Sequence, residues 1–175
     1  MRWLPFQLNP DIPEGGIPRE EYVARKFGAR GKGVNERVVM AGRQVGIPFA
    51  YEKMTVQPNT LNTHRLMHYA GRAGKQDELA EELFVAHFTE GAVLADPETL
   101  ADIAARAGLD RRAAADYLAS DEDKAVIEQA DVEARSAGIG GVPFFIFNRK
   151  VRLSGAQDPE TLLEAMEQAL KERDG

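Results

Sequence analysis

Residues 138–155 read GIGGVPFFIFNRKVRLSG, and this stretch decides the fold. Pro143 has no N–H to give to a sheet, so it belongs at the first position of a strand. The unbroken apolar run after it favours a strand buried on both faces. Residues 151–154 alternate between apolar and polar side chains, which is typical of a second strand with one solvent-exposed face. Asn148 tolerates the left-handed backbone of a tight connection. The stretch therefore predicts a β-hairpin.

The N-terminal third of the chain is less regular. Residues 2–8 alternate weakly around Pro5 and predict a short strand at a sheet edge. Residues 19–27 carry an apolar stripe at helical spacing, and residues 34–45 predict a second helix. Residues 47–59 predict a loop, and a long loop inside a compact domain is often functional.

The middle of the chain is helical. Residues 60–119 predict four helices with no strand among them. Asp96 and Asp158 each open a DPETL segment, which combines an N-cap aspartate with a proline and a glutamate in the first turn. Asp110 and Ser120 also predict caps for the helices that follow them. A helical block between strands is typical of an all-helical insertion into a small α/β fold.

Composition bounds the function. The chain has 22 basic and 28 acidic residues and a net charge of −6, which argues against a nucleic-acid partner. No apolar run is long enough to span a membrane, so no membrane partner is expected. There is no cysteine, which excludes disulfides and thiolate metal sites within these residues. No signal peptide is visible, which predicts a cytoplasmic protein.

Two pairs of stretches carry a family resemblance. Residues 141–147 (GVPFFIF) and 153–163 (LSGAQDPETLL) resemble the C-terminal half of a thioredoxin fold in the DsbA-like thiol-disulfide oxidoreductases. Residues 3–10 (WLPFQLNP) and 21–28 (EYVARKFG) are similar to the FrnE-like subgroup, close to the 2-hydroxychromene-2-carboxylate isomerases and kappa-class glutathione transferases. The resemblance implies an α/β, thioredoxin-like fold with an all-helical insertion.

The same resemblance implies a division of the chain. Residues 1–18 would form the N-terminal strand and loop of the thioredoxin-like domain. Residues 19–120 would form the mainly helical insertion, and residues 121–175 the C-terminal helix, the β-hairpin and the last helix. Family members begin with a strand and a Cys-x-x-Cys helix, so we expect the first strand and the active-site helix to be missing from this chain.

Three functions follow from the resemblance. The first is a FrnE-type protein thiol-disulfide oxidoreductase or isomerase. Residues 1–175 would be redox-inactive and without catalytic residues, because thiol-disulfide exchange needs a thiolate and these residues include no cysteine. The second is a glutathione-dependent 2-hydroxychromene-2-carboxylate isomerase or a kappa-class transferase-like enzyme. The third is a non-catalytic peptide-binding module. No cofactor is expected, and glutathione is a candidate co-substrate.

The candidate substrate-binding residues lie in two places. X-Pro bonds are mostly trans, so the residues alone predict a trans Pro143, whereas the resemblance implies a cis-proline. Val142 would then offer its N–H and C=O to an extended ligand. The resemblance also makes Asn59, Thr60 and His64 candidates for lining the cleft, although helix capping explains Asn59 and Thr60 equally well.

A metal site is not expected. His64 and His68 stand four residues apart, hence on one helix face, a spacing that can hold a metal. No third ligand follows at a motif distance, so a structural role for both imidazoles is favoured.

The expected partner is a thiol- or disulfide-containing protein or peptide, or glutathione. In the thioredoxin fold the missing strand would lie between residues 2–8 and residues 143–147, so its absence would expose two apolar edges. We expect the N-terminal strand either to move in beside residues 144–147 or to pair across a homodimer.

Overall fold

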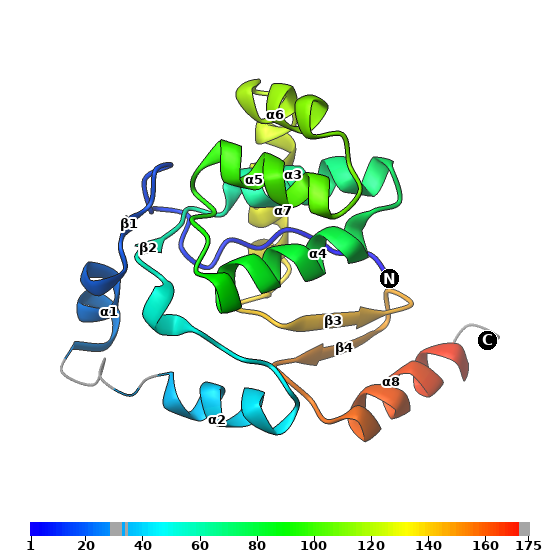
Figure 1. The fold of residues 1–175 in the computed structure, drawn as a ribbon. Helices are drawn as coiled ribbons and strands as arrows, with labels where there is room; N and C mark the ends of the chain where they lie inside the picture. Colours follow the sequence, from blue (N-terminus) through cyan, green and yellow to red (C-terminus); the bar gives the residue numbers. More distant parts are fainter. Residues whose placement is uncertain (29–32, 34, 172–175) are drawn as a thin grey trace. The chain divides into compact units, whose positions relative to one another are not determined.

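The computed structural model describes residues 1–28, 33 and 35–171. The chain divides into two compact units, Met1–Glu128 and Gln129–Gly175, hereafter the first unit and the second unit. Figure 1 traces the helices and strands of both units along the sequence. Each unit is described by itself.

Short elements open the first unit. β1 (Ile17–Pro18) pairs antiparallel with β2 (Val56–Gln57). α1 (Arg19–Phe27) follows at once, with acidic residues in its first turn and basic residues in its last, where they complement the helix dipole. α2 (Glu36–Gln44) confirms the second predicted helix, except that residue 34, its expected start, lies outside the described residues.

The segment 47–59 is a loop with two short elements in it. A single 3₁₀ turn, η2 (Tyr51–Lys53), precedes β2. The neighbouring backbone bond from the Arg19 N–H to the Thr55 carbonyl, 2.9 Å long, continues the pairing of β1 with β2. The loop prediction therefore holds except for the short strand at Val56–Gln57.

The strand predicted over residues 2–8 is wrong. The described residues of this segment form no ladder, because helix side chains take up its backbone groups. The Trp3 N–H donates to Gln76 Oε1 (3.2 Å), and a ring nitrogen of His64 lies 3.1 Å from the Phe6 carbonyl oxygen. β3 pairs with β4 alone among the described strands, so the expectation that residues 2–8 move in beside residues 144–147 is also wrong.

The four predicted helices of residues 60–119 are confirmed as α3 (Leu61–Arg72), α4 (Gln76–Val85), α5 (Pro97–Arg106) and α6 (Arg111–Ala119). Their apolar faces form the core of the first unit. Leu66, Leu79 and Leu100 lie at its centre with no exposed surface. This packing supplies most of the helical stability, because short isolated helices are marginal in water.

α4 continues into a π-helix, η3 (Ala86–Glu90), which the spacing of apolar residues did not reveal. Gly91 ends it in the left-handed region at φ 77°. A Cβ at this position would lie 2.7 Å from the Lys53 carbonyl oxygen, so only glycine fits.

Aspartates begin three helices, as predicted. Asp96, Asp110 and Asp158 each accept a backbone N–H three residues on, over 3.0, 2.8 and 2.8 Å. The prediction for Ser120 is wrong. Ser120 closes α6 by donating its hydroxyl to the Tyr117 carbonyl (2.7 Å), and α7 (Lys124–Ser136) begins only after a further turn.

The second unit holds the predicted hairpin. β3 (Phe144–Phe147) pairs antiparallel with β4 (Val151–Ser154), with Phe145 opposite Leu153, and α8 (Pro159–Lys171) buries Ala165 and Ala169. α7 begins in the first unit and ends in the second. β3 is not buried on both faces, however, because 42% of Ile146 is exposed.

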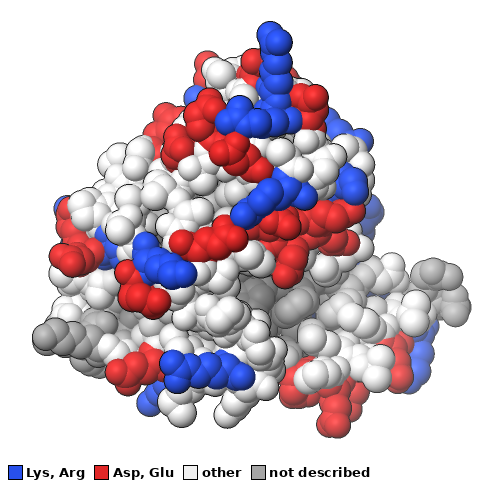
Figure 2. All heavy atoms as spheres, viewed as in Figure 1, with Lys and Arg blue, Asp and Glu red and all other residues white. Residues whose placement is uncertain are grey.

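The surface is charged and mixed. Figure 2 shows acidic and basic side chains interspersed over the displayed face. Among the described residues, no helix has the length and apolar character needed to cross a bilayer.

The cap of α5 predicts an acid-dependent contribution to stability. The Thr99 hydroxyl and N–H, which donate to Asp96, lower the pKa of that carboxyl. Because the folded pKa lies below the unfolded one, this stabilisation is present above about pH 4 and is lost as the pH falls through the folded pKa. Asp96→Ala should lower the free energy of unfolding by about 1 kcal/mol at pH 7. Urea denaturation at pH 7 and pH 3 should show a smaller difference at the lower pH.

Asp116→Ala is the matched control for this cap. The Asp116 side chain is 77% exposed and lies 4.0 Å from Arg112. Its loss should change stability by less than about 0.5 kcal/mol. Equal losses in the two variants would argue against a cap effect at Asp96.

Candidate functional site

The first candidate site is the entrance to β3 in the second unit. The Val142–Pro143 peptide bond is cis, the isomer that the family resemblance implies. The Pro143 carbonyl accepts the Gly155 N–H over 2.9 Å, which ties this bond to the end of β4. Val142 is 49% exposed, and among the described residues neither its N–H nor its C=O has a hydrogen-bond partner.

Beyond Pro143, no described strand pairs with the edge of β3 that faces away from β4. Antiparallel partners alternate between pairs that exchange hydrogen bonds and pairs that do not. The Gly155 bond to Pro143 flanks the pair Phe144 with Ser154, which is thus of the second kind. The N–H and C=O of Phe144 and Ile146 therefore point to this edge, while those of Phe145 and Phe147 bond to β4.

The turn of the hairpin is built as predicted. Asn148 and Arg149 have φ values of 49° and 61°, both left-handed. The Lys150 N–H donates to the Phe147 carbonyl (3.0 Å), and the Asn148 amide donates to the Ala169 carbonyl of α8 (3.1 Å). These bonds fix the end of β3, and the parallel rings of Phe145 and Phe147, 6.3 Å apart, stiffen one face of it.

The second group of candidates lies at the start of α3 in the first unit. Asn59 is already engaged by the protein. Its Nδ2 donates to the Ile12 carbonyl (2.6 Å), and its Oδ1 accepts the Leu61 N–H (2.8 Å). Asn59 thus caps the first turn of α3 and holds the segment before β1 against it. Thr60 precedes the helix without a side-chain cap bond.

His64 also contacts the N-terminal segment. Its Nε2 lies 3.1 Å from the Phe6 carbonyl oxygen, and since a carbonyl only accepts, Nε2 is the protonated nitrogen. The contacts of Asn59 and His64 are those of supporting residues, and direct ligand binding by Asn59, Thr60 and His64 stays a prediction. These three residues lie in the first unit and Val142 with Pro143 in the second.

The imidazole of His68, one turn after His64 on α3, lies near an acidic side chain. Its Nε2 is 3.9 Å from Asp123 Oδ2. Within the described ranges, no group of three or more His, Cys, Asp or Glu side chains could hold a metal ion.

Sequence reasoning missed Arg65, the residue that positions this part of α3. Its guanidinium is fully buried and donates to acceptors 2.8–3.2 Å away: Asn62 Oδ1 and the carbonyls of Tyr117, Leu118, Ser120 and Glu122. Most of these carbonyls end α6, where the helix has no further N–H partners and the dipole favours a cation. The only available signal was its place in a helix of strong apolar periodicity.

Tyr117 closes the network around Arg65. Its hydroxyl donates to Asp123 Oδ2 (2.9 Å), and its ring lies 5.0 Å from the Arg65 guanidinium and 4.8 Å from the Tyr69 ring. Burial and the bond to Asp123 raise the pKa of the Tyr117 phenol well above its usual value. The phenol thus stays protonated and keeps donating at physiological pH.

Comparison with known proteins defines the family. The model of the DSBA-like thioredoxin domain family matches residues 1–167. The chain belongs to this family. The thioredoxin-like fold with a helical insertion, predicted from the sequence, is therefore confirmed.

Two solved structures are similar to the chain. A probable DsbA oxidoreductase from Streptomyces coelicolor aligns with a TM-score of 0.85 and 26% identity, over 95% of this chain and 74% of that one. A structure described as a protein disulfide isomerase from Nitrosomonas europaea aligns with a TM-score of 0.69 and 14% identity, over 87% and 88% of the two chains, which shows the fold alone. No curated protein matches the chain significantly.

The Arg65 network predicts a large loss of stability on substitution. Arg65→Met keeps much of the volume but removes the buried donors to the carbonyls of Leu118, Ser120 and Glu122. The free energy of unfolding, measured by urea denaturation, should fall by about 3–5 kcal/mol. Arg65→Lys keeps three donors, so its free energy of unfolding should lie between those of Arg65→Met and the parent.

Arg72→Met is the control, because Arg72 also bonds to Glu122 and Asp123 but its side chain is 47% exposed. Arg72→Met should lower the free energy of unfolding by about 1 kcal/mol or less. Similar losses for Arg65→Met and Arg72→Met would contradict the role given to the buried guanidinium.

Proposed function

We propose that the entrance to β3 binds an extended polypeptide segment by strand addition at Val142. The observation that carries the proposal is the exposed Val142 backbone, whose N–H and C=O have no partner among the described residues. An extended ligand can satisfy both groups at once, and main-chain bonds of this kind give affinity without requiring any one ligand sequence. Neither group has to give up a bond within the described chain to accept the ligand.

The chemical class of the ligand follows from the family. The chain belongs to a thioredoxin-domain family in which a similar structure is described as an oxidoreductase. We infer a FrnE-type role, with a cysteine-containing peptide or glutathione as the ligand. Residues 1–175 contain no thiol, so the contribution of these residues is to bind and orient the segment.

The rigidity of the site supports binding. The Gly155 bond holds Pro143, and the left-handed turn with the Asn148 bond to α8 holds the other end of β3. A strand fixed at both ends loses little conformational entropy when a ligand pairs with it. The ligand itself must still be ordered, so we expect weak, micromolar to millimolar binding.

Removing the Val142 N–H tests the proposal. In ¹⁵N-correlation NMR, a cysteine-containing peptide of about six residues and reduced glutathione should each be titrated into the chain. The amides of Val142 and Phe144 should shift first. Val142→Pro removes the donor and should weaken binding about tenfold, because one bond of about 1.4 kcal/mol is lost.

Val142→Ala keeps the N–H and is the matched control, with binding expected within about threefold of the parent. A Val142→Pro variant that binds the peptide or glutathione as tightly as the parent does would contradict the proposal. Binding of glutathione alone would move the assignment toward the glutathione-dependent class, and binding of neither ligand would leave no binding role for this entrance.

A further inference from the structure

His87 is a buried histidine in the first unit. Only 9% of the residue is exposed, whereas His64 and His68 are partly exposed. His87 belongs to the π-helix η3, and π-helical turns occur often at functional sites. Its Nδ1 lies 3.5 Å from the Ala92 carbonyl oxygen, and because a carbonyl only accepts, Nδ1 carries the proton. The structure therefore holds the neutral imidazole.

The immediate surroundings of His87 oppose a charged ring. The ring of Phe88 meets the imidazole edge to face at a centroid distance of 4.9 Å. Among the described residues, no acceptor hydrogen-bonds to Nε2 of His87 and no carboxylate pairs with it. A protonated ring would thus combine a buried charge with an Nε2–H that has no acceptor, and both are costly.

The nearest charge makes protonation harder still. Burial lowers the pKa of His87, and the hydrogen bond at Nδ1 opposes this effect. The positive charge of Arg19, at the start of α1, lowers the pKa further. Arg19 is held in place by its hydrogen bond to Gln57 of β2 and by its contact with the Tyr22 ring. A cation fixed in this way adds to the cost of a charged imidazole.

The titratable groups of η3 and of the elements packed against it have other partners. Glu90 of η3 and Glu82 of α4 both pair with Arg106 of α5, each over 2.9 Å. On η2, Lys53 donates to a carbonyl of η3 (3.3 Å), and burial raises the pKa of Tyr51, which keeps its phenol neutral. These groups therefore supply the imidazole with no anion.

η3 also holds the segment 47–54, which lies beside the end of α4 in Figure 1. The Ala50 N–H donates to the Phe88 carbonyl over 2.8 Å, and the Phe49 ring lies 5.9 Å from the Phe88 ring. Phe49 in turn packs on Gly42 of α2, where a Cβ would lie 2.4 Å from the phenyl ring. A change in η3 therefore reaches both this segment and α2.

We propose that His87 is an acid-sensitive switch, whose protonation opens η3 and releases the segment 47–54 from it. The inference rests on the burial and contacts of His87 and does not depend on the proposed ligand binding. Because the pKa of His87 is lower in the closed form than in the open one, the closed form is fully favoured above about pH 6.5. It loses this advantage as the pH falls through the closed-form pKa. Such a short unit opens at a lower free energy than the whole fold.

Amide hydrogen exchange at about pH 7.5 and about pH 5.5, on either side of an ordinary histidine pKa, tests the switch. The Ala50 and Ala92 amides bond to carbonyls of η3. Their opening equilibria, corrected for the intrinsic effect of pH on exchange, should rise about three- to tenfold at the lower pH, and tenfold is the limit for one histidine. The Ala107 amide, which bonds to Ile103 in the core (3.1 Å), should change less than about twofold. No rise at Ala50 and Ala92, or an equal rise at Ala107, would overturn the proposal.

His87→Gln removes the titration. Glutamine keeps a side-chain N–H for the Ala92 carbonyl but takes up no proton in this range, so the rise in opening should shrink to less than about twofold. His68→Gln is the matched control, because it makes the same change at a histidine whose side chain is 40% exposed. The control should keep the rise of about three- to tenfold. A His87→Gln variant that keeps the rise, or a His68→Gln variant that loses it, would reject the role of His87.

The imidazole signals of the parent cover the case in which His87→Gln fails to fold. In ¹⁵N–¹H correlation spectra of the ring, His87 should be neutral with its proton on Nδ1 as long as the Ala50 amide is protected. A charged His87 ring at about pH 5.5, with the Ala50 amide as well protected as at about pH 7.5, would contradict the proposal.

Discussion

The fold of the first unit depends on the buried guanidinium of Arg65. Burying a charge is costly unless every donor is satisfied, and here the acceptors are carbonyls at the end of α6 and just beyond it. The same hydrogen bonds also supply the carbonyls at the end of α6 with donors that this helix cannot provide itself. These bonds fix α3 against α6, and this contact therefore positions the candidate residues at the start of α3.

The second unit obeys a different constraint. Its hairpin is held at both ends, by the Gly155 bond to Pro143 and by the Asn148 bond to α8. The outer edge of each strand has no partner among the described strands, and the proposed ligand pairs with the edge of β3.

Local signals made most of the fold predictable. Aspartate caps, glycine ends and the apolar run after Pro143 act over a few residues, and the helices and the hairpin followed from them. Apart from the cap predicted at Ser120 and the π-helix after α4, the failures came from contacts between residues far apart in the sequence. Residues 2–8 look like a strand until the side chain of Gln76 takes up the Trp3 backbone, 73 positions away. The acceptors of Arg65 lie 52 to 57 residues further along the chain, apart from Asn62. In the candidate site, the role of Val142 stays a prediction that comes from the family resemblance, and nothing in the sequence indicated that Asn59 and His64 contact the N-terminal segment.

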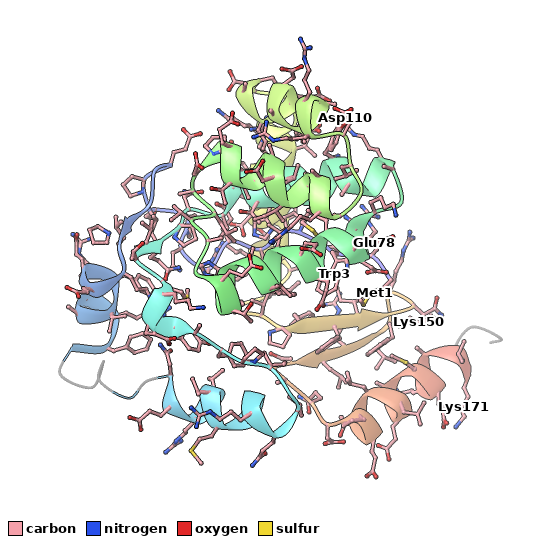
Figure 3. The ribbon with its side chains drawn as sticks, in the orientation of Figure 1. Met1, Trp3, Glu78, Asp110, Lys150 and Lys171 are labelled. Carbon is pink, nitrogen blue, oxygen red and sulfur yellow. The ribbon has the colours of Figure 1, made fainter. Side chains whose placement is uncertain are left out.

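Trp3 is the sole tryptophan, so the intrinsic fluorescence of the chain reports the surroundings of this one side chain. Its indole N–H donates to Asp77 Oδ1 (2.6 Å), its ring lies 6.3 Å from Phe84, and Figure 3 shows it beside α4. Intrinsic fluorescence therefore reports whether the N-terminal segment is seated on α4. The hairpin contains no such chromophore, so a fluorescence melting curve follows the first unit, and the second unit needs an optical label of its own.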